Sequence, residues 1–207
     1  MLQQQTRWGI LYCPRKSFLS SASGRWEKIE KCLKSNGIEY DFVQSEKSSS
    51  VVRLMNMMLS NGYKTIIIVG GDSALNDAVN CIMEADEATR NSVRLGVIPN
   101  GLMNDFARYW GFKESDPEQT IKWLKEGRVR KVDLGCIRYV NSKGEKCHRY
   151  FLNCVNIGLL SAIMNLRNQT RKLFGSRTLS YIFSMLLMVF QRLEYRMHLK
   201  INDEEIK

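Results

Sequence analysis

The spacing of apolar residues predicts that strands and helices alternate along the first 130 residues. A short strand at Trp8–Tyr12 precedes a helix at Gly24–Ser35, whose apolar positions recur every three or four residues. Glycine follows this helix at Gly37, where a helix stop is expected. The pattern continues with a strand at Ile38–Val43, a helix at Ser49–Ser60 closed by Gly62, a helix at about Ala74–Met83, a short helix from Asn104, a helix at Pro117–Glu126 and a strand at Val129–Leu134.

Two further strands are apolar without polar alternation. Thr65–Val69 is a continuous β-branched run, and Leu95–Ile98 is the second such segment. This pattern is typical of strands that are buried on both faces, as parallel sheets require. Strands alternating with helices then form right-handed β-α-β units. We therefore predict an α/β fold with an open, mostly parallel sheet flanked by helices.

The pattern changes after residue 131. Val132–Val140 and Cys147–Val155 are predicted strands, joined by a hairpin loop at Asn141–Glu145. A helix at Leu179–Leu193 follows. Tyr195, Met197, Leu199 and Ile201 then alternate with polar residues, as in a half-exposed strand, and the acidic residues 202–205 are interpreted as an exposed turn. We expect an α/β nucleotide-binding domain at 1–130 and part of a second, β-rich domain at 131–207.

The charge is concentrated in the second half of the chain. Thirty-one Lys and Arg against 21 Asp and Glu give a net charge of +10, and Lys122–Arg149 alone contains nine basic and three acidic residues. Such an excess favours nucleic acid, phosphorylated ligands or an acidic membrane surface, with a solvated basic surface as the equal alternative. Leu166–Ser180 interleaves basic and apolar residues, which suits either membrane contact or a packed basic loop.

The remaining composition points to the cytoplasm. Six cysteines without a C-x-x-C pair, and only two histidines, predict free thiols and no zinc site. The first residues lack the apolar core of a signal peptide. The most apolar stretch, Tyr181–Phe190, has ten residues where a bilayer needs about 20. We expect a cytoplasmic protein that can lie at the inner membrane surface.

The first candidate loop is Gly70-Gly71-Asp72, directly after the buried strand. Glycines allow a tight turn and a close approach of backbone to ligand. Backbone N–H groups at the start of the following helix can then bind a phosphate. Asp72 can hold Mg²⁺ or accept a proton from a hydroxyl. An ordinary turn of the same composition is the alternative.

The second candidate loop runs from Pro99 to Met103 and leads into the short helix. Asn104 and Asp105 are both suited to capping that helix, which needs only one of them. Arg108 lies one turn later and is expected to pair with Asp105, or else to bind a phosphate. Both loops follow strand ends, where open parallel sheets bind their ligands.

These two loops carry a resemblance to a known family. Val69–Asp77 resembles the GGDGTxNE signature of the diacylglycerol kinase catalytic family, and Leu95–Arg108 resembles its LGxxPxGTxNDFAR signature. The family includes diacylglycerol, sphingosine and ceramide kinases and bacterial lipid kinases. Lys131–Gly135 and Phe151–Asn153 resemble segments that the family has at the entry to its second domain.

The resemblance implies a fold like that of NAD kinases and diacylglycerol kinases, followed by a β-sandwich domain. It implies transfer of the ATP γ-phosphoryl group to a lipid hydroxyl, with Mg²⁺ as a second cofactor. Asp72 would be the catalytic base and the metal ligand. The lipid would be diacylglycerol or a related alcohol, with no nucleic acid, and an open sheet edge would permit a homodimer. The residues implied in nucleotide binding are Gly70, Gly71, Asp72, Ser73, Ala74, Asn76, Leu102, Asn104 and Asp105.

The chain departs from both signatures. Ser73 and Ala74 replace Gly and Thr of the first, and Asn100, Leu102 and Met103 replace Leu, Thr and Gly of the second. If position 73 requires a positive φ, serine costs roughly 1–2 kcal/mol there. Met103 would fill part of the nucleotide cleft. The alternative hypothesis is therefore a catalytically degenerate member that binds a nucleotide or a lipid.

Overall fold

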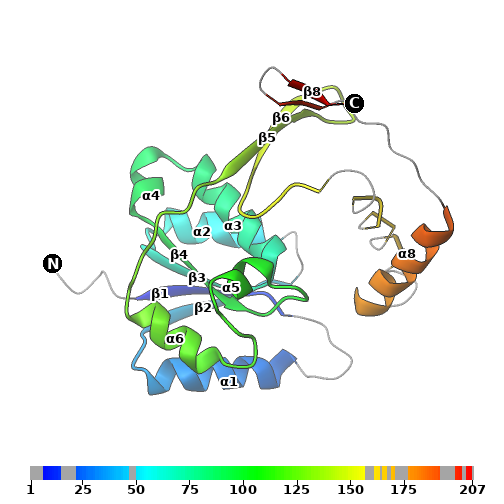
Figure 1. The fold of residues 1–207 in the computed structure, drawn as a ribbon. Helices are drawn as coiled ribbons and strands as arrows, with labels where there is room; N and C mark the ends of the chain where they lie inside the picture. Colours follow the sequence, from blue (N-terminus) through cyan, green and yellow to red (C-terminus); the bar gives the residue numbers. More distant parts are fainter. Residues whose placement is uncertain are drawn as a thin grey trace. The chain divides into compact units, whose positions relative to one another are not determined.

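The computed structural model describes residues 7–14, 22–46, 50–156, 161–163, 165–166, 169–170, 177–191, 199–201 and 204–206. The chain divides into two compact units, Met1–Cys154 and Val155–Lys207. The first unit is a central sheet between two layers of helices (Figure 1). The predicted domain boundary at residue 130 stays a prediction.

The central sheet contains four parallel strands in the order β2-β1-β3-β4. In β1, Trp8 pairs with Tyr40 of β2 and with Thr65 of β3, and Thr65 pairs in turn with Arg94 of β4. This confirms the predicted open parallel sheet. The strands are β1 (Trp8–Tyr12), β2 (Tyr40–Gln44), β3 (Thr65–Gly70) and β4 (Arg94–Pro99).

The apolar run of β3 serves two separate cores. Ile66 and Ile68 pack with residues of helices α2 (Ser50–Ser60) and α3 (Asp72–Glu84). Ile67 and Val69 belong to the opposite core, with residues of α1 (Ala22–Ser35) and α6 (Pro117–Lys125). Because successive side chains of a strand point to opposite faces, a strand covered on both sides must be apolar throughout.

The helix ends follow local chemistry. Gly37 and Gly62 adopt positive φ values of 64° and 77° after α1 and α2, as predicted helix stops should. Asp86 caps the short helix α4 (Glu87–Ser92) by accepting from the Thr89 N–H group. This helix was not predicted, because it has six residues and buries none of them. The short helix α5 spans Asp105–Tyr109.

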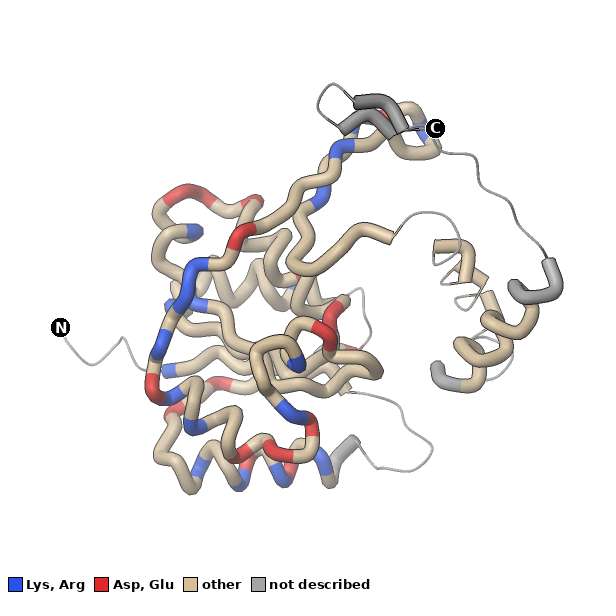
Figure 2. The backbone as a smooth tube through the Cα atoms, viewed as in Figure 1, with Lys and Arg blue, Asp and Glu red and all other residues tan. Residues whose placement is uncertain are grey.

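A hairpin follows, formed by β5 (Gly135–Val140) and β6 (Lys146–Phe151). The predicted loop is confirmed, since the Asn141 side chain accepts from the N–H groups of Lys143 and Glu145. The predicted strand at Val129–Leu134 is wrong. That basic segment runs without regular structure between α6 and β5 (Figure 2), and its Val129 is 59% exposed. A strand requires a neighbouring strand, and this segment instead contacts the Trp110 ring through Arg130.

The second unit contains α8 (Arg177–Gln191) and a small antiparallel sheet of β7 (Leu199–Ile201) and β8 (Glu204–Ile206). The predicted turn at 202–205 is wrong where it is described, because Glu204 and Glu205 belong to β8 and pair with β7. Tyr195 and Met197 of the predicted strand, and part of the predicted basic segment 166–180, lie outside the described residues. Among the described helices, none is both long enough and apolar enough to cross a bilayer.

Candidate functional site

The two predicted loops lie side by side at the carboxyl edge of the sheet. Gly70 pairs with Pro99 at the ends of β3 and β4, and the Asn100 N–H group donates to the Gly70 carbonyl at 2.8 Å. The strand order places β2 and β3 on opposite sides of β1. In open α/β sheets such a reversal creates the crevice in which ligands bind.

Two glycines bring the loops into direct backbone contact. A Cβ atom added at Gly71 would lie 2.8 Å from the Gly101 Cα atom, and one added at Gly101 would lie 2.4 Å from the Gly71 Cα atom. Both distances are far below van der Waals contact. Glycine is therefore required at both positions by the contact between loops, before any ligand is considered.

Asp72 joins the first loop to α5. Its carboxylate oxygens accept from the N–H group of Asp105 at 3.1 Å and from that of Phe106 at 3.0 Å. These donors are in the first turn of the helix, where backbone N–H groups have no partner within the helix. The predicted capping by Asn104 or Asp105 is wrong, because Asp72 supplies the cap from 33 residues away. Asp105 instead forms the predicted ion pair with Arg108.

Asn104 has a left-handed backbone, with φ 54° and ψ 43°, and its side chain turns back onto the loop. Its Oδ1 atom accepts from the Gly101 N–H group at 2.7 Å, and its Nδ2 atom donates to the Gly101 carbonyl at 3.2 Å. Asn104 is 5% exposed. Asparagine tolerates this conformation better than most residues, and these bonds hold it there.

The first loop continues directly into α3. Ser73 and Ala74 lie in its first turn, and the Leu75 N–H group donates to the Gly71 carbonyl at 3.1 Å. Ser73 has no positive φ, so the strain predicted for serine at this position is absent. Gly71, at the N-cap position, has no side chain to cap the helix. The partial positive charge of this helix start therefore has no capping side chain of its own.

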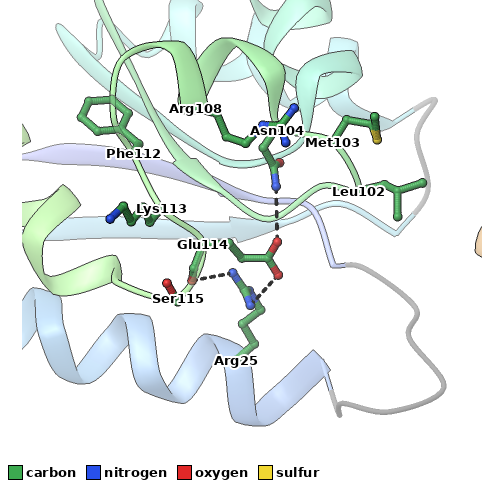
Figure 3. Close-up of a pocket in the computed structure, with 9 residues that line it drawn as sticks. All are labelled: Arg25, Leu102, Met103, Asn104, Arg108, Phe112, Lys113, Glu114 and Ser115. Atoms are coloured by element: carbon green, nitrogen blue, oxygen red, sulfur yellow. Dashed lines mark hydrogen bonds and ion pairs between the residues drawn. The ribbon is translucent and has the colours of Figure 1, made fainter.

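A pocket of about 500 Å³ adjoins the second loop (Figure 3). Of the predicted binding residues, Leu102 and Asn104 line this pocket. It also contains Met103, which is 49% exposed and forms part of the wall rather than closing the space. Three cationic side chains and one carboxylate line it, which favours an anionic ligand. The lining residues are Arg25, Leu102, Met103, Asn104, Arg108, Phe112, Lys113, Glu114 and Ser115.

Sequence reasoning missed Arg25 and Glu114. Arg25 comes from α1, where it donates to the carbonyl oxygens of Pro99 at 3.0 Å and Glu114 at 3.2 Å. It also forms an ion pair with the Glu114 carboxylate at 2.8 Å. No sequence motif joins two residues 89 positions apart, so the sequence contained no local signal for this pair.

Buried polar groups lie in and beside the second loop. Tyr12, at the end of β1, is 1% exposed, and burial raises the pKa of its hydroxyl. The Nε atom of Arg25 and the Oδ1 atom of Asn100 are buried without a hydrogen-bond partner among the described residues. A buried donor and a buried acceptor without partners fit a polar group or a water bound beside them.

Mg²⁺ would find few protein ligands here. The Asp72 carboxylate lies beside the backbone N–H group of Asp105, but no cluster of three or more His, Cys, Asp or Glu suited to a metal occurs in the described part of the chain. Mg²⁺ commonly uses one or two carboxylates and takes its other ligands from substrate phosphates and water. Asp72 fits that arrangement only in the presence of a nucleotide.

Comparison with known proteins gives the family. Residues 13–137 match the family described as the diacylglycerol kinase catalytic domain. The chain belongs to this family. A diacylglycerol kinase of Staphylococcus epidermidis (strain RP62A) is 32% identical over 136 residues, which are 66% of this chain and 37% of that protein. A diacylglycerol kinase of Staphylococcus carnosus (strain TM300) is 29% identical over 81% of this chain and 51% of its own length.

Solved structures show the same fold. A crystal structure of a diacylglycerol kinase from Bacillus anthracis str. Sterne has a TM-score of 0.56 at 20% identity, covering 73% of this chain and 50% of that one. A second structure from this strain has a TM-score of 0.63 at 16% identity, covering 99% of this chain and 64% of that one. The chain thus spans between 37% and 64% of the length of these four proteins.

Proposed function

We propose that this diacylglycerol kinase family chain forms the nucleotide-binding part of an ATP-dependent lipid kinase. The observation that carries the proposal is the joined pair of signature loops at the ends of β3 and β4, beside a cation-lined pocket. The loops are linked by Asp72 and by the contact of Gly71 with Gly101. The pocket contributes Arg25, Arg108 and Lys113.

The bound nucleotide would supply the phosphoryl group, and the protein would supply position and positive charge. In the proposal, the uncapped start of α3 at Asp72, Ser73 and Ala74 binds phosphate oxygens through its N–H groups. Lys113 and Arg108 add positive charge along the pocket. The backbone N–H groups are held by the helix before the ligand arrives, so they need little reorganisation on binding.

The role proposed for Asp72 combines positioning with metal binding. Two N–H groups of α5 already hold its oxygens. A carboxylate offers about four acceptor sites, so lone pairs remain for Mg²⁺ or a substrate hydroxyl. Gly70, Gly71, Asn76, Leu102 and Asp105 keep their proposed roles in ordering the nucleotide.

The second candidate function is a binding module without phosphoryl transfer. Two observations favour it: the Asp72 carboxylate is engaged by α5, and Met103 stands in the pocket wall. The kinase requires nucleotide binding in the first unit, whereas the module would bind a nucleotide or a lipid. They differ in whether a phosphorylated lipid is produced.

The properties of the whole protein belong to the same proposal. The substrate would be diacylglycerol or a related lipid alcohol, reached from the cytoplasm at an inner membrane surface. The net charge of +10 supports contact with an anionic surface. A homodimer stays a prediction.

The test is calorimetric titration of Mg²⁺-ATP into the wild type and into Lys113→Gln. We expect a wild-type dissociation constant of roughly 1 mM or tighter, within the usual range for enzyme substrates. Lys113→Gln should weaken binding by about fivefold, as expected for the loss of about 1 kcal/mol from one charged contact. Lys122→Gln is the matched control, because Lys122 pairs with Glu118 on α6 and does not line the pocket.

Folded wild-type protein that gives no heat at millimolar ATP would contradict the proposal. Equal weakening by both substitutions would show that only general charge attracts ATP, and the pocket would then be excluded. A protein that binds ATP but forms no phosphorylated lipid with diacylglycerol vesicles would support the binding-module function instead.

A further inference from the structure

A chain of contacts crosses the wall of the pocket from α1 to the second loop (Figure 3). Arg25 forms an ion pair with the Oε1 atom of Glu114 at 2.8 Å. The other carboxylate oxygen of Glu114, Oε2, accepts from the Nδ2 atom of Asn104 at 3.3 Å. Asn104 in turn binds both the N–H and the carbonyl group of Gly101.

The conformation at the end of this chain of contacts is unusual. Asn104 is the one non-glycine residue with positive φ in the described part of the chain. A residue keeps such a conformation only where its surroundings determine it. Its neighbour in these contacts, Gly101, is the residue that touches Gly71 of the first loop. The conformation of Asn104 therefore contributes to how the two signature loops meet.

Glu114 also decides which way the Asn104 amide faces. A carboxylate only accepts hydrogen bonds, so the amide must turn its Nδ2 atom toward Glu114. Its Oδ1 atom is then left to accept from Gly101, as the structure shows at 2.7 Å. Arg25 fixes Glu114 in turn, since it holds both the carboxylate and the carbonyl oxygen of that residue.

We propose that Arg25 and Glu114 are positioning residues that hold Asn104 in its left-handed conformation and so fix the second loop against the first. The proposal deepens the proposed function, because this loop is part of the nucleotide site. The two residues act through Asn104 and Gly101. Arg25 and Glu114 are partly exposed, with side-chain exposures of 27% and 31%, so either can be substituted without opening the buried core.

The test is hydrogen exchange in the full 207-residue chain, followed in peptides that cover residues 99–106. Glu114→Ala removes both contacts and should accelerate exchange there by roughly tenfold, as for the loss of a charge-assisted hydrogen bond. Glu114→Gln should have a smaller effect, because its amide offers one acceptor oxygen where the carboxylate offers two. The buried strand β3 is the internal reference for global unfolding.

Two further variants make the test specific. Glu118→Ala removes a glutamate of α6 whose ion pair, in the part of the chain that the structure describes, is with Lys122, and it should leave the loop unchanged. Asn104→Gly keeps access to the left-handed backbone but removes the side chain through which Glu114 acts. In that background, Glu114→Ala should produce no further acceleration.

The proposal would be overturned if Glu114→Ala left the exchange of residues 99–106 unchanged. It would also be overturned if the effects of Glu114→Ala and Asn104→Gly on this exchange simply added. ATP titration of Glu114→Ala gives a second readout, and affinity should fall with the loss of protection. Equal or tighter ATP binding would overturn the positioning role. If the wild type binds no ATP, the proposed function fails, while the exchange experiment still decides whether Glu114 positions the loop.

Discussion

The contacts of Asp72 give it a structural role in addition to any role in catalysis. Its two oxygens accept from two N–H groups of α5, so the carboxylate of the first signature loop is also the cap of the helix that follows the second. Replacing a capping carboxylate by alanine usually costs about 0.5–2 kcal/mol. A loss of activity on substituting Asp72 would therefore combine a chemical and a structural effect.

We predict that Asp72→Ala lowers the free energy of unfolding by about 1–2 kcal/mol, because two N–H groups lose their acceptor. Asp72→Asn should cost less, since its amide keeps one acceptor oxygen. Urea unfolding of the two variants measures this difference. Asp86→Ala, which removes the local cap of α4, is the comparison. A free energy of unfolding unchanged in Asp72→Ala would contradict the capping role.

At the scale of elements, α1 is fastened to β2 by a tyrosine. The Tyr40 hydroxyl donates to the Glu30 carboxylate at 3.0 Å, and Glu30 also pairs with Lys34 on the same helix. Burial, followed by this hydrogen bond, raises the pKa of Tyr40 to about 12. The protonated hydroxyl is the form that the folded protein stabilises.

This raised pKa predicts a loss of stability at alkaline pH. An unfolded tyrosine has a pKa of about 10, so the contribution of Tyr40 is complete below that pH. It is lost as the pH rises through the folded pKa of about 12. Tyr40→Phe should therefore lose stability less steeply between these two values than the wild type does. Urea unfolding across the range measures both slopes.

The control for this comparison is pH 7, where tyrosine is protonated in both the folded and the unfolded protein. There the two proteins should differ by a constant amount that reflects the hydrogen bond to Glu30. Equal slopes at alkaline pH would mean that Tyr40 does not titrate differently in the folded protein.

At the scale of the whole molecule, one buried amide attaches the β5–β6 hairpin to the α/β layers. Asn80 of α3 donates to the Tyr150 carbonyl at 3.0 Å and accepts from the Tyr150 N–H group at 2.9 Å. Its side chain thus pairs with β6 as a neighbouring strand would. An ion pair between Asp77 and Arg149 lies nearby, with an arginine side chain that is 49% exposed.

We predict that Asn80→Ala lowers the free energy of unfolding by about 1–3 kcal/mol, because two backbone groups of Tyr150 lose their partners. Asp77→Asn should cost about 1 kcal/mol or less, as partly exposed ion pairs usually do. Urea unfolding gives the energies, and hydrogen exchange of residues 146–151 locates the effect. If Asp77→Asn lowered the free energy of unfolding by more than Asn80→Ala does, the ion pair, and not Asn80, would hold the hairpin.

The sequence by itself determined the layers of this protein and the position of its candidate loops. Ile66–Val69 is apolar at every position because both faces of β3 are covered, and that pattern is visible without a structure. The glycine helix stops at Gly37 and Gly62 and the hairpin loop at Asn141–Glu145 are equally local. Periodicity and turn chemistry report on neighbours within a few residues, which is why these predictions are confirmed.

Only the tertiary structure decided which partner each polar side chain finds. Asp72 caps a helix 33 residues away, and Arg25 reaches a glutamate 89 residues away. The β-branched residues of Val129–Leu134 suit a strand, yet the segment pairs with none of the described strands. Such contacts depend on how separate segments approach one another in the fold. Spacing along the chain carries no information about that approach.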